Sequence, residues 1–549
     1  MKPDEEIHKA GFLSSENISG TKQPQILFPG PLPVSVSIGF IATEQSFDIE
    51  KVLKSVKTVF LKMEKILFNT PHTYRFILPF NPGPEHIILE SLSKDPIWKK
   101  CNEPKVVLLK IPFRDDEIRM PFEGEISFDV EIVSEEGNSK KVSESHYEPV
   151  IERSSFVILT GEWEPETTKY RKGSVFDIAR NYGRTVVAIN PLMEETFEMP
   201  HDDRIFESYT QLNDYNSEYL SDYLFQKKAL KYISALREEC KNAGLSEDAI
   251  SKIYSQLLPQ FIRSRMLSEK YRMYYSIAGT FASILAAMAV LTITLQTLFF
   301  PEMPEIVWIE VAEIFLIILL MTGSRYGDFH RKWIDYSFLS ERIRAAFFLC
   351  IVCITCEKPD TPPHMSLAHR PNDWMVMAFE SLTESGKIEY CRLDIPFEPL
   401  KKFFASAWIG YKLKFYKERS RSSRKKFFYL AIAGETIFVL TLILAVIHAA
   451  GIGHWEIRNV EGSLMLAYLT ITLPAVGSAI AAVRVQREYL RNSERYSHIV
   501  RHLTAIKNQT RHVRDMGELC GVLEEMNEIT LREQQDWRII FRFRRIEAM

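Results

Sequence analysis

Glycines and acids gather where several predicted strands end, and such a pattern can bind a small charged molecule. The candidate contacts are Gly39, Gly83, Glu85, Gly161, Glu162, Gly173, Ser174 and Asp177. Glycine allows a ligand to approach the backbone closely, and a carboxylate accepts hydrogen bonds from hydroxyl or amino groups. We expect these positions to converge on one ligand-binding crevice.

The segment KGSVFD places Gly173 and Ser174 at the start of a predicted helix, with Asp177 one turn in. A glycine and a hydroxyl at a helix N-terminus favour a phosphate, because free backbone amides and the helix dipole attract an anion. The alternative is that Ser174 is simply an N-cap. The residues alone leave both interpretations open.

The sequence gives a weaker signal for a catalytic or metal-binding site than for a ligand-binding site. His86 follows Glu85 at a predicted helix start, which is typical of an exposed residue, and no histidine or cysteine completes a nucleophilic arrangement. Cys350, Cys353 and Cys356 recur every three residues and are interpreted as small apolar residues on a buried helix. We therefore expect no catalytic residue, no metal and no cofactor.

These positions depend on an alternation of strands and helices in the first third of the chain. Strands are predicted at 34–42, 74–80, 104–113, 154–163 and 184–190, with helices at 47–68, 84–92 and 174–183. The alternation predicts a parallel sheet with helices on both faces. Ligands of such sheets bind outside the carboxyl ends of the strands. The fold class is thus α/β, with a Rossmann-like cytosolic domain.

Four apolar segments follow, at 274–300, 306–321, 427–448 and 464–483. A helix needs about 20 apolar residues to cross the hydrocarbon core of a membrane, and the second segment is short of that length. It is interpreted as the return leg of a hairpin. We predict an all-α transmembrane domain of four helices, joined to long cytosolic helices.

Lysine and arginine residues flank the segments on one side only. They precede the first and third segments and follow the second and fourth, whereas the two hairpin loops share a single arginine, Arg458. Because such residues stay in the cytoplasm, we expect both termini to be cytoplasmic in a multi-pass protein of the inner (plasma) membrane. The net charge of −3 gives no indication of a nucleic-acid partner.

Three acids lie inside the apolar segments: Glu310 and Glu313 in the second, and Glu435 in the third. Ionisable groups within a bilayer are costly and usually functional. We interpret the three as candidates for lining a pore. The alternatives are that Glu310 and Glu313 reach water at the outer surface, and that Glu435 pairs with a nearby lysine or arginine.

The two hairpins look duplicated. YYSIAG, from Tyr274, resembles FYLAIAG, from Phe428, and DFHRKWIDYSFLSERIRAAF resembles REYLRNSERYSHIVRHLTAI. Together with EEMNEITLREQQDWRIIFR near the C-terminus, this plan resembles tandem domains of the SLATT family over roughly 230–549. SLATT domains are two-helix membrane modules of prokaryotic conflict systems, and the resemblance implies pore formation or membrane disruption after a linked sensor is triggered.

The first third resembles the SLOG family of Rossmann-like domains, over about 34–191. The matching segments are IGF with Gly39, LPFNPGPEHIILESL, RSSFVILTGEWEPE and KGSVFDIARNYGRTVVAINP. The resemblance implies a nucleotide-derived ligand bound by the eight candidate contacts. The first loop, GFIATEQ, lacks the second glycine and basic pair of some members. The PGGxGTxxE motif of the hydrolytic relatives is absent, which favours binding over hydrolysis.

The domain boundaries follow from these patterns: an N-terminal extension at 1–33, the SLOG-like domain at 34–200, a linker at 201–228, the first SLATT-like unit at 229–356, a connector at 357–399 and the second unit at 400–549. We predict a membrane effector of an anti-phage type system, which oligomerises in the bilayer and responds to a nucleotide-derived signal. The alternatives are a membrane-tethered nucleotide hydrolase or glycosidase, and an ion channel or transporter.

Overall fold

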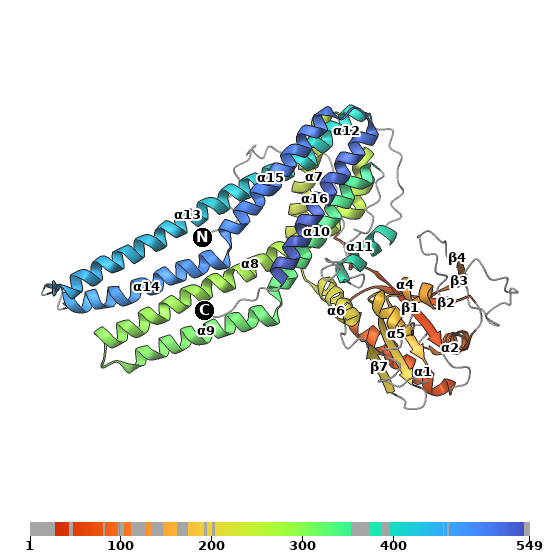
Figure 1. Cartoon of the computed structure of the whole chain (residues 1–549), viewed down its shortest axis with the longest axis horizontal. Helices are drawn as coiled ribbons and strands as arrows, with labels where there is room; N and C mark the ends of the chain where they lie inside the picture. The colour runs from red at the N-terminus through yellow and green to blue at the C-terminus, as the bar shows by residue number, and fades with distance from the viewer. Residues whose placement is uncertain are drawn as a thin grey trace.

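The structure is a computed structural model of the chain, and Figure 1 shows a sheet-containing region beside an elongated helical region. It describes residues 28–42, 48–80, 83–96, 98, 104–110, 128–132, 147–161, 174–190, 195–199, 204–246, 248–352, 373–385, 396–453, 455–457 and 460–542. Two of the candidate contacts, Glu162 and Gly173, lie outside these ranges.

Seven strands form the main sheet, in the order β4-β3-β2-β1-β5-β6-β7. Their bounds are β1 Val34–Ala42, β2 His72–Pro79, β3 Lys105–Lys110, β4 Phe128–Ile132, β5 Phe156–Thr160, β6 Thr185–Asn190 and β7 Glu195–Met199. The first six pair in parallel, and β7 pairs antiparallel with β6. The predicted parallel sheet is therefore confirmed for its five predicted strands; β4 extends it in parallel, and β7 adds an antiparallel edge that was not predicted.

Helices cover both faces of this sheet, as the strand–helix alternation predicts. They are α1 Ile49–Ile66, α2 Pro84–Ser93, α4 Glu148–Arg153, α5 Val175–Asn181 and α6 Arg204–Ser217. Successive strand residues point to opposite faces: Phe76 packs in the core with α1, α2 and α6, whereas Ile77 packs in the core with α4 and α5. Continuously apolar strands such as Phe156–Thr160 result from burial on both faces.

The helical region is built from long elements that pack lengthwise (Figure 1). They are α7 Asp222–Ala243, α8 Asp248–Phe299, η2 Pro304–Ile306, α9 Val307–Tyr326, α10 Phe329–Ile351, α11 Trp374–Ser385, α12 Phe397–Phe403, η4 Phe404–Gly410, α13 Tyr411–Ala449, α14 Gly462–Gln486, α15 Tyr489–His512 and α16 Met516–Arg542. A two-stranded ribbon, β8 Glu456–Ile457 and β9 Val460–Glu461, joins α13 to α14. The predicted linker at 201–228 contains α6 and the start of α7.

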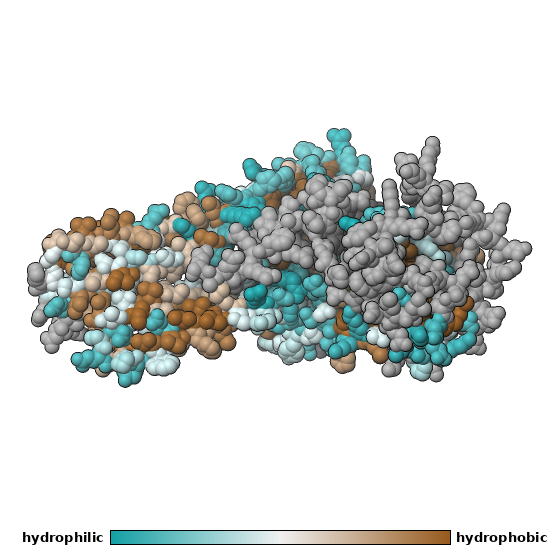
Figure 2. Space-filling view, turned by 60° about the horizontal axis from the view of Figure 1, so that its bottom comes forward, coloured by the Kyte–Doolittle hydropathy of each residue, from teal (hydrophilic) through white to brown (hydrophobic). Residues whose placement is uncertain are grey.

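Four of these helices are long and apolar enough to cross a membrane. They form two pairs, which we call hairpin 1 (α8 and α9) and hairpin 2 (α13 and α14). Figure 2 shows hydrophobic side chains gathered on the hairpin end of the molecule, in brown. The second apolar helix, α9, has 20 residues, so it is longer than the segment predicted at 306–321.

The duplication of the two hairpins appears in the backbone. Asp328 and Glu488 are the only non-glycine residues with positive φ in the described part of the chain, at 49° and 46°. Asp328 separates α9 from α10, and Glu488 separates α14 from α15. With these two residues aligned, Tyr336 of α10 corresponds to Tyr496 of α15. The same left-handed kink therefore ends each hairpin.

Candidate functional site

The sheet topology defines where a ligand would bind. β1 and β5 are neighbours at the centre, and the chain continues from them toward opposite edges of the sheet. Ligands of open parallel sheets bind outside the carboxyl ends at this reversal of strand order. The carboxyl ends here are Ala42 of β1 and Thr160 of β5. We call this end of the sheet the crevice edge.

Glu85 is the buried acid of the crevice edge. It lies in the first turn of α2, which follows β2, and is 4% exposed. Its carboxylate folds back over Gly83, because a Cβ built on that glycine would lie 2.3 Å from Glu85 Oε1. Glu85 Oε2 accepts no hydrogen bond from the described residues. A buried acceptor without a donor is costly, so this oxygen is suited to a ligand that donates.

Tyr147 lies beside that carboxylate, at the N-cap of α4. Its hydroxyl donates to the carbonyl oxygen of Ala42 over 3.3 Å, at the end of β1. Burial, and then the negative charge of Glu85, raise the pKa of the Tyr147 hydroxyl. Tyr147 therefore stays neutral near pH 7 and can act as a hydrogen-bond donor at the crevice edge. Tyr147 was not predicted as a candidate contact, because no motif marks it in the sequence.

His86 is buried rather than exposed, so its interpretation as a surface residue was wrong. It is 3% exposed, and its Nδ1 accepts a hydrogen bond from the Gly83 backbone N–H over 3.1 Å. This contact caps the first turn of α2 and holds the neighbouring Glu85 in place. In neutral imidazole, an accepting Nδ1 leaves the proton on Nε2. The capping pattern G-P-E-H was the sequence signal that could have predicted burial.

Four further candidate contacts are placed by the structure. Gly161 directly follows β5 at the crevice edge, with φ of 151°. Ser174 is the N-cap of α5, and its side chain accepts from the Asp177 backbone N–H over 3.3 Å. Gly39 lies inside β1 rather than after it, and a Cβ there would lie 2.5 Å from Ser154 Oγ. Gly39 therefore allows α4 to approach the strand, and its predicted place at the strand end was wrong.

A second polar cluster joins the sheet to the helical region, and we call it the Glu218 clamp. Glu218 follows α6 and accepts from Lys270 Nζ over 3.0 Å, from Lys332 Nζ over 2.9 Å and from the Tyr271 hydroxyl. Burial alone would raise the pKa of Glu218, but these donors hold it below its ordinary value of 4.5. An ionised Glu218 thus ties the end of α6 to both α8 and α10.

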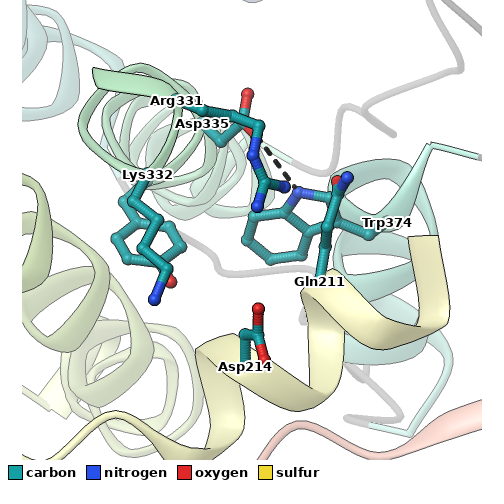
Figure 3. A pocket seen from close by; sticks show the side chains of 7 residues that line it. Gln211, Asp214, Arg331, Lys332, Asp335 and Trp374 are labelled. Atoms are coloured by element: carbon teal, nitrogen blue, oxygen red, sulfur yellow. Dashed lines mark hydrogen bonds between the residues drawn. The ribbon is translucent and has the colours of Figure 1, made fainter. Parts of the chain in front are cut away.

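Figure 3 shows the small pocket next to this clamp, between α6, α10 and α11. Its lining residues are Gln211, Asp214, Arg331, Lys332, Asp335, Tyr336 and Trp374. The Trp374 indole N–H donates to Asp335 Oδ2 over 3.4 Å, and burial raises the pKa of Asp214 against the opposing charges of Lys332 and Arg331. The pocket's own polar groups fill it, so it is a joint between the regions rather than a ligand site.

The amino end of the sheet carries more of this connection. Arg263 of α8 is 3% exposed, and it donates to the carbonyl oxygens of Tyr215 and Asn216 over 3.0 and 2.9 Å. Asn216 in turn bonds both the N–H and the carbonyl of Leu32, two residues before β1. The helical region is therefore attached at the amino edge of the sheet, opposite the crevice edge.

The acids of the apolar helices occupy three different surroundings. Glu313 is buried between α8 and α9, where Thr292 Oγ1 donates to it over 3.4 Å. Glu310 is half-buried in the first turn of α9. Glu435 is exposed on α13 and has no ion pair or hydrogen bond with the described residues. The structure thus separates Glu435 from the other two.

Comparison with known proteins adds no relative: no protein-family model, no curated protein and no solved structure matches the chain.

Proposed function

We propose that the chain is a membrane effector of a prokaryotic anti-phage type system. In this proposal the sheet is a SLOG-like sensor of a nucleotide-derived signal, and hairpins 1 and 2 belong to SLATT-like units that span the inner membrane. Signal binding converts the assembled hairpins to a state that leaks or disrupts the membrane. Both termini are cytoplasmic, because basic residues flank the open ends of the hairpins, whereas the hairpin loops are nearly free of them.

The observation that carries this proposal is the continuity of α8. This single helix of 52 residues begins in the packed cytosolic region and ends at the tip of hairpin 1. Its cytosolic half holds the sheet region through Arg263 and Lys270. Since an α-helix rises 1.5 Å per residue, it extends about 78 Å. A displacement of the sheet region would therefore move hairpin 1 directly.

The chemistry of the crevice edge favours a nucleoside-containing signal. Glu85 Oε2 needs a donor, and ribose hydroxyls donate to the acid that follows the second strand in dinucleotide-binding sheets. Gly161 and Ser174 both follow β5, and Ser174 is the N-cap of α5. Helix N-termini favour phosphate. A ligand with hydroxyls at one end and phosphate at the other would match both sides of the edge.

The signal must cross the sheet, because the crevice edge and the Glu218 clamp lie at opposite ends of the strands. A ligand shifts such an equilibrium only by its difference in affinity between the resting and active states. A near-complete switch needs a difference of about four orders of magnitude. We infer that the whole sheet region moves as one body on α8 and α10, since seven paired strands resist internal deformation.

The test uses the full chain in liposomes loaded with a self-quenching dye. We would compare the chain with Glu85→Gln and with the matched control Glu90→Gln, which changes a surface acid on the same helix paired with Lys94. Candidate nucleotide signals should cause dye release in the parent and control, with at least tenfold weaker response in Glu85→Gln. Equal release from all three proteins would remove the crevice edge from the mechanism.

The second candidate function is a membrane-tethered nucleotide hydrolase or glycosidase, favoured by the burial of Glu85 beside Tyr147. A buried carboxyl can act as a general acid or base. The same liposome samples discriminate the two functions: nucleotide consumption without dye release would support the enzyme, and dye release with intact nucleotide would support the effector.

A further inference from the structure

The four apolar helices lie in a row in the order α9, α8, α14, α13 (Figure 1), with contacts between α9 and α8, α8 and α14, and α14 and α13. The two end helices are the most open. In the most apolar stretch of α9, 6% of the residues are buried, and in that of α13 the share is 0%. The corresponding shares are 28% for α8 and 17% for α14. The row therefore has two free edges, one from each hairpin.

The central contact of the row, between α8 and α14, joins hairpin 1 to hairpin 2. At its cytosolic end Gln486 lies over Gly279, where a Cβ would lie 1.4 Å from the Gln486 amide nitrogen. Arg487 donates to Thr280 Oγ1 over 2.7 Å. At its other end the rings of Phe299 and Tyr468 are 5.7 Å apart. We call this contact the inner seam.

Because the hairpins are duplicated, each surface of the inner seam has a counterpart on one of the two free edges. The matching IAG motifs align Gly279 with Gly434 and Thr280 with Glu435, both on α13. The matching kinks at Asp328 and Glu488 align Gln486 with Tyr326 and Tyr468 with Trp308, both on α9. Helix α9 thus carries the counterpart of the α14 surface, and α13 carries the counterpart of the α8 surface.

These counterpart positions are unfilled. Tyr326 is 86% exposed and Trp308 is 73% exposed. No atom lies within 4 Å of a Cβ built on Gly434. Large exposed aromatic side chains opposite an open glycine complement one another in shape, as Gln486 and Gly279 do in the inner seam.

The charges of the two edges are also complementary. Glu435 lies nine residues beyond Lys426, about 14 Å along the helix, where an exposed carboxylate in hydrocarbon is costly. Arg325, next to Tyr326, is exposed at the cytosolic end of α9, and its side chain has no ion pair or hydrogen bond with the described residues. Under the kink alignment the counterpart of Arg487 is Gly327. Arg325 of another copy would therefore lie two residues, about 3 Å along the helix, from the level of Glu435, within the reach of its long side chain.

We propose that copies of this chain join head to tail, with α9 of one copy packed on α13 of the next in a repeat of the inner seam. Tyr326 covers Gly434 of the neighbouring copy and donates its hydroxyl to Glu435, whose charge the Arg325 guanidinium balances. A heterologous contact of this kind closes into a ring where the rotation permits. This inference deepens the proposed function by naming its partner surface, and it rests on that function for the membrane setting.

The test is cysteine cross-linking in membranes between two differently tagged full-length copies, one carrying Tyr326→Cys and the other Gly434→Cys. We expect an oxidant to form a disulfide that joins the two tags. The matched control replaces Gly434→Cys by Ile432→Cys. Its counterpart Ile277 remains 43% exposed beside the inner seam, so Ile432 should lie off the new contact and cross-link at least tenfold less.

A second arm tests the charges. In Cys-bearing copies, Arg325→Glu and Glu435→Arg should each reduce the cross-link to the control level, and the two together should restore it. A disulfide between Gly279→Cys and Gln486→Cys within one chain reports that the inner seam has formed. A charge variant that loses this disulfide is misfolded, and Glu435→Thr, the milder change, then replaces it.

Cross-linking equal to the Ile432→Cys control, with the inner seam intact, would overturn the proposal and leave lipid or another protein against α13. Neither result depends on a signal or on leakage. If the copies cross-link as expected but the chain never releases dye, the head-to-tail assembly is supported and the proposed function is refuted.

Discussion

The two hairpin units follow one plan but differ in how each is attached to its neighbouring element, which is the end of α6 for the first unit and α16 for the second. In the first unit, Tyr271 and Tyr336 pack with ring centroids 5.7 Å apart, and in the second Tyr416 and Tyr496 do the same at 5.7 Å. Each tyrosine pair lies beside a glutamate that comes from outside the two helices. In the first unit this is Glu218, and in the second it is Glu533 of α16.

The two glutamates differ in how many donors offset their burial. Glu218 accepts from two lysines and Tyr271, which holds its pKa below 4.5. Glu533 accepts from Tyr416 over 3.3 Å and pairs with Arg495, yet its burial dominates and its pKa is raised. Breaking a buried pair by removing one partner is costly in proportion to the charge left behind. The first unit is therefore the more firmly fixed one, and it is the unit that holds the sheet region.

Glu218→Gln should have the largest effect, because it leaves Lys270 and Lys332 close together without their shared anion. We expect a loss of about 2 to 3 kcal/mol in the free energy of unfolding, reduced from the fully buried case because both lysines are partly exposed. Denaturant unfolding in detergent micelles measures it, and protease cleavage near residue 219 should accelerate as α6 separates from α8.

Glu533→Gln is the matched change in the second unit. It should cost only about 1 kcal/mol, since the neutral amide keeps a hydrogen bond and the charge was poorly offset. Equal losses for the two variants would mean that the units hold their partners equally firmly, and the comparison would fail.

The second prediction concerns the shared left-handed kinks. Asp328→Val and Glu488→Val place a β-branched side chain at positive φ, which should cost about 1 to 2 kcal/mol or more at each site. Asp328→Asn and Glu488→Asn should be tolerated, because asparagine adopts this conformation readily. Thermal unfolding of the four variants measures it. Losses that differ widely between the two valine variants would show that the kinks are not equivalent.

Most of the architecture was predictable because it follows from periodicity. The apolar runs at 34–42 and 184–190 predicted β1 and β6, and the four apolar segments predicted the four long helices. The strands β4 and β7 were missed, because FDVEI and ETFEM each carry two acids in five residues and resemble loops. Edge strands need only one apolar face, so their composition gives a weak signal.

The site was predictable only where a motif marks a strand end. Glu85 was found from the NPGPE turn, but the burial of His86 depends on a backbone contact with Gly83 that no periodicity shows. Tyr147 is separated from Glu85 by 62 residues in sequence, and only the sheet order brings them together. The Glu218 clamp joins α6, α8 and α10, and such long-range ion pairs cannot be inferred from spacing.

The third prediction uses pH to separate the units. The pKa of Glu218 is lower in the folded chain, so its stabilisation is present above 4.5 and is lost as the pH falls through the folded pKa. The pKa of Glu533 is higher in the folded chain, so its contribution is present below 4.5 and is lost as the pH rises through the folded pKa. The two dependences have opposite signs.

Unfolding midpoints measured in detergent from about pH 6 down to about pH 3 test this. The parent should lose stability relative to Glu218→Gln as the pH falls, whereas the parent should gain relative to Glu533→Gln over the same range. If the unfolding midpoints of the parent and of both variants change equally with pH, the directions assigned to the two pKa shifts are wrong.

The smallest effect compares the two glycines of the IAG motifs in single chains in detergent. Gly279→Ala pushes a methyl group against the Gln486 side chain, which can shift, so we expect a loss of about 1 kcal/mol or less. Gly434→Ala meets open space, and the better helix propensity of alanine should raise stability by a few tenths to about 1 kcal/mol. Thermal unfolding of dilute protein measures both changes. In membranes the order should reverse for assembly: Gly434→Ala should reduce co-purification of two differently tagged full-length copies, while Gly279→Ala should leave it unchanged, because in the proposed assembly a neighbouring chain covers the open glycine of hairpin 2.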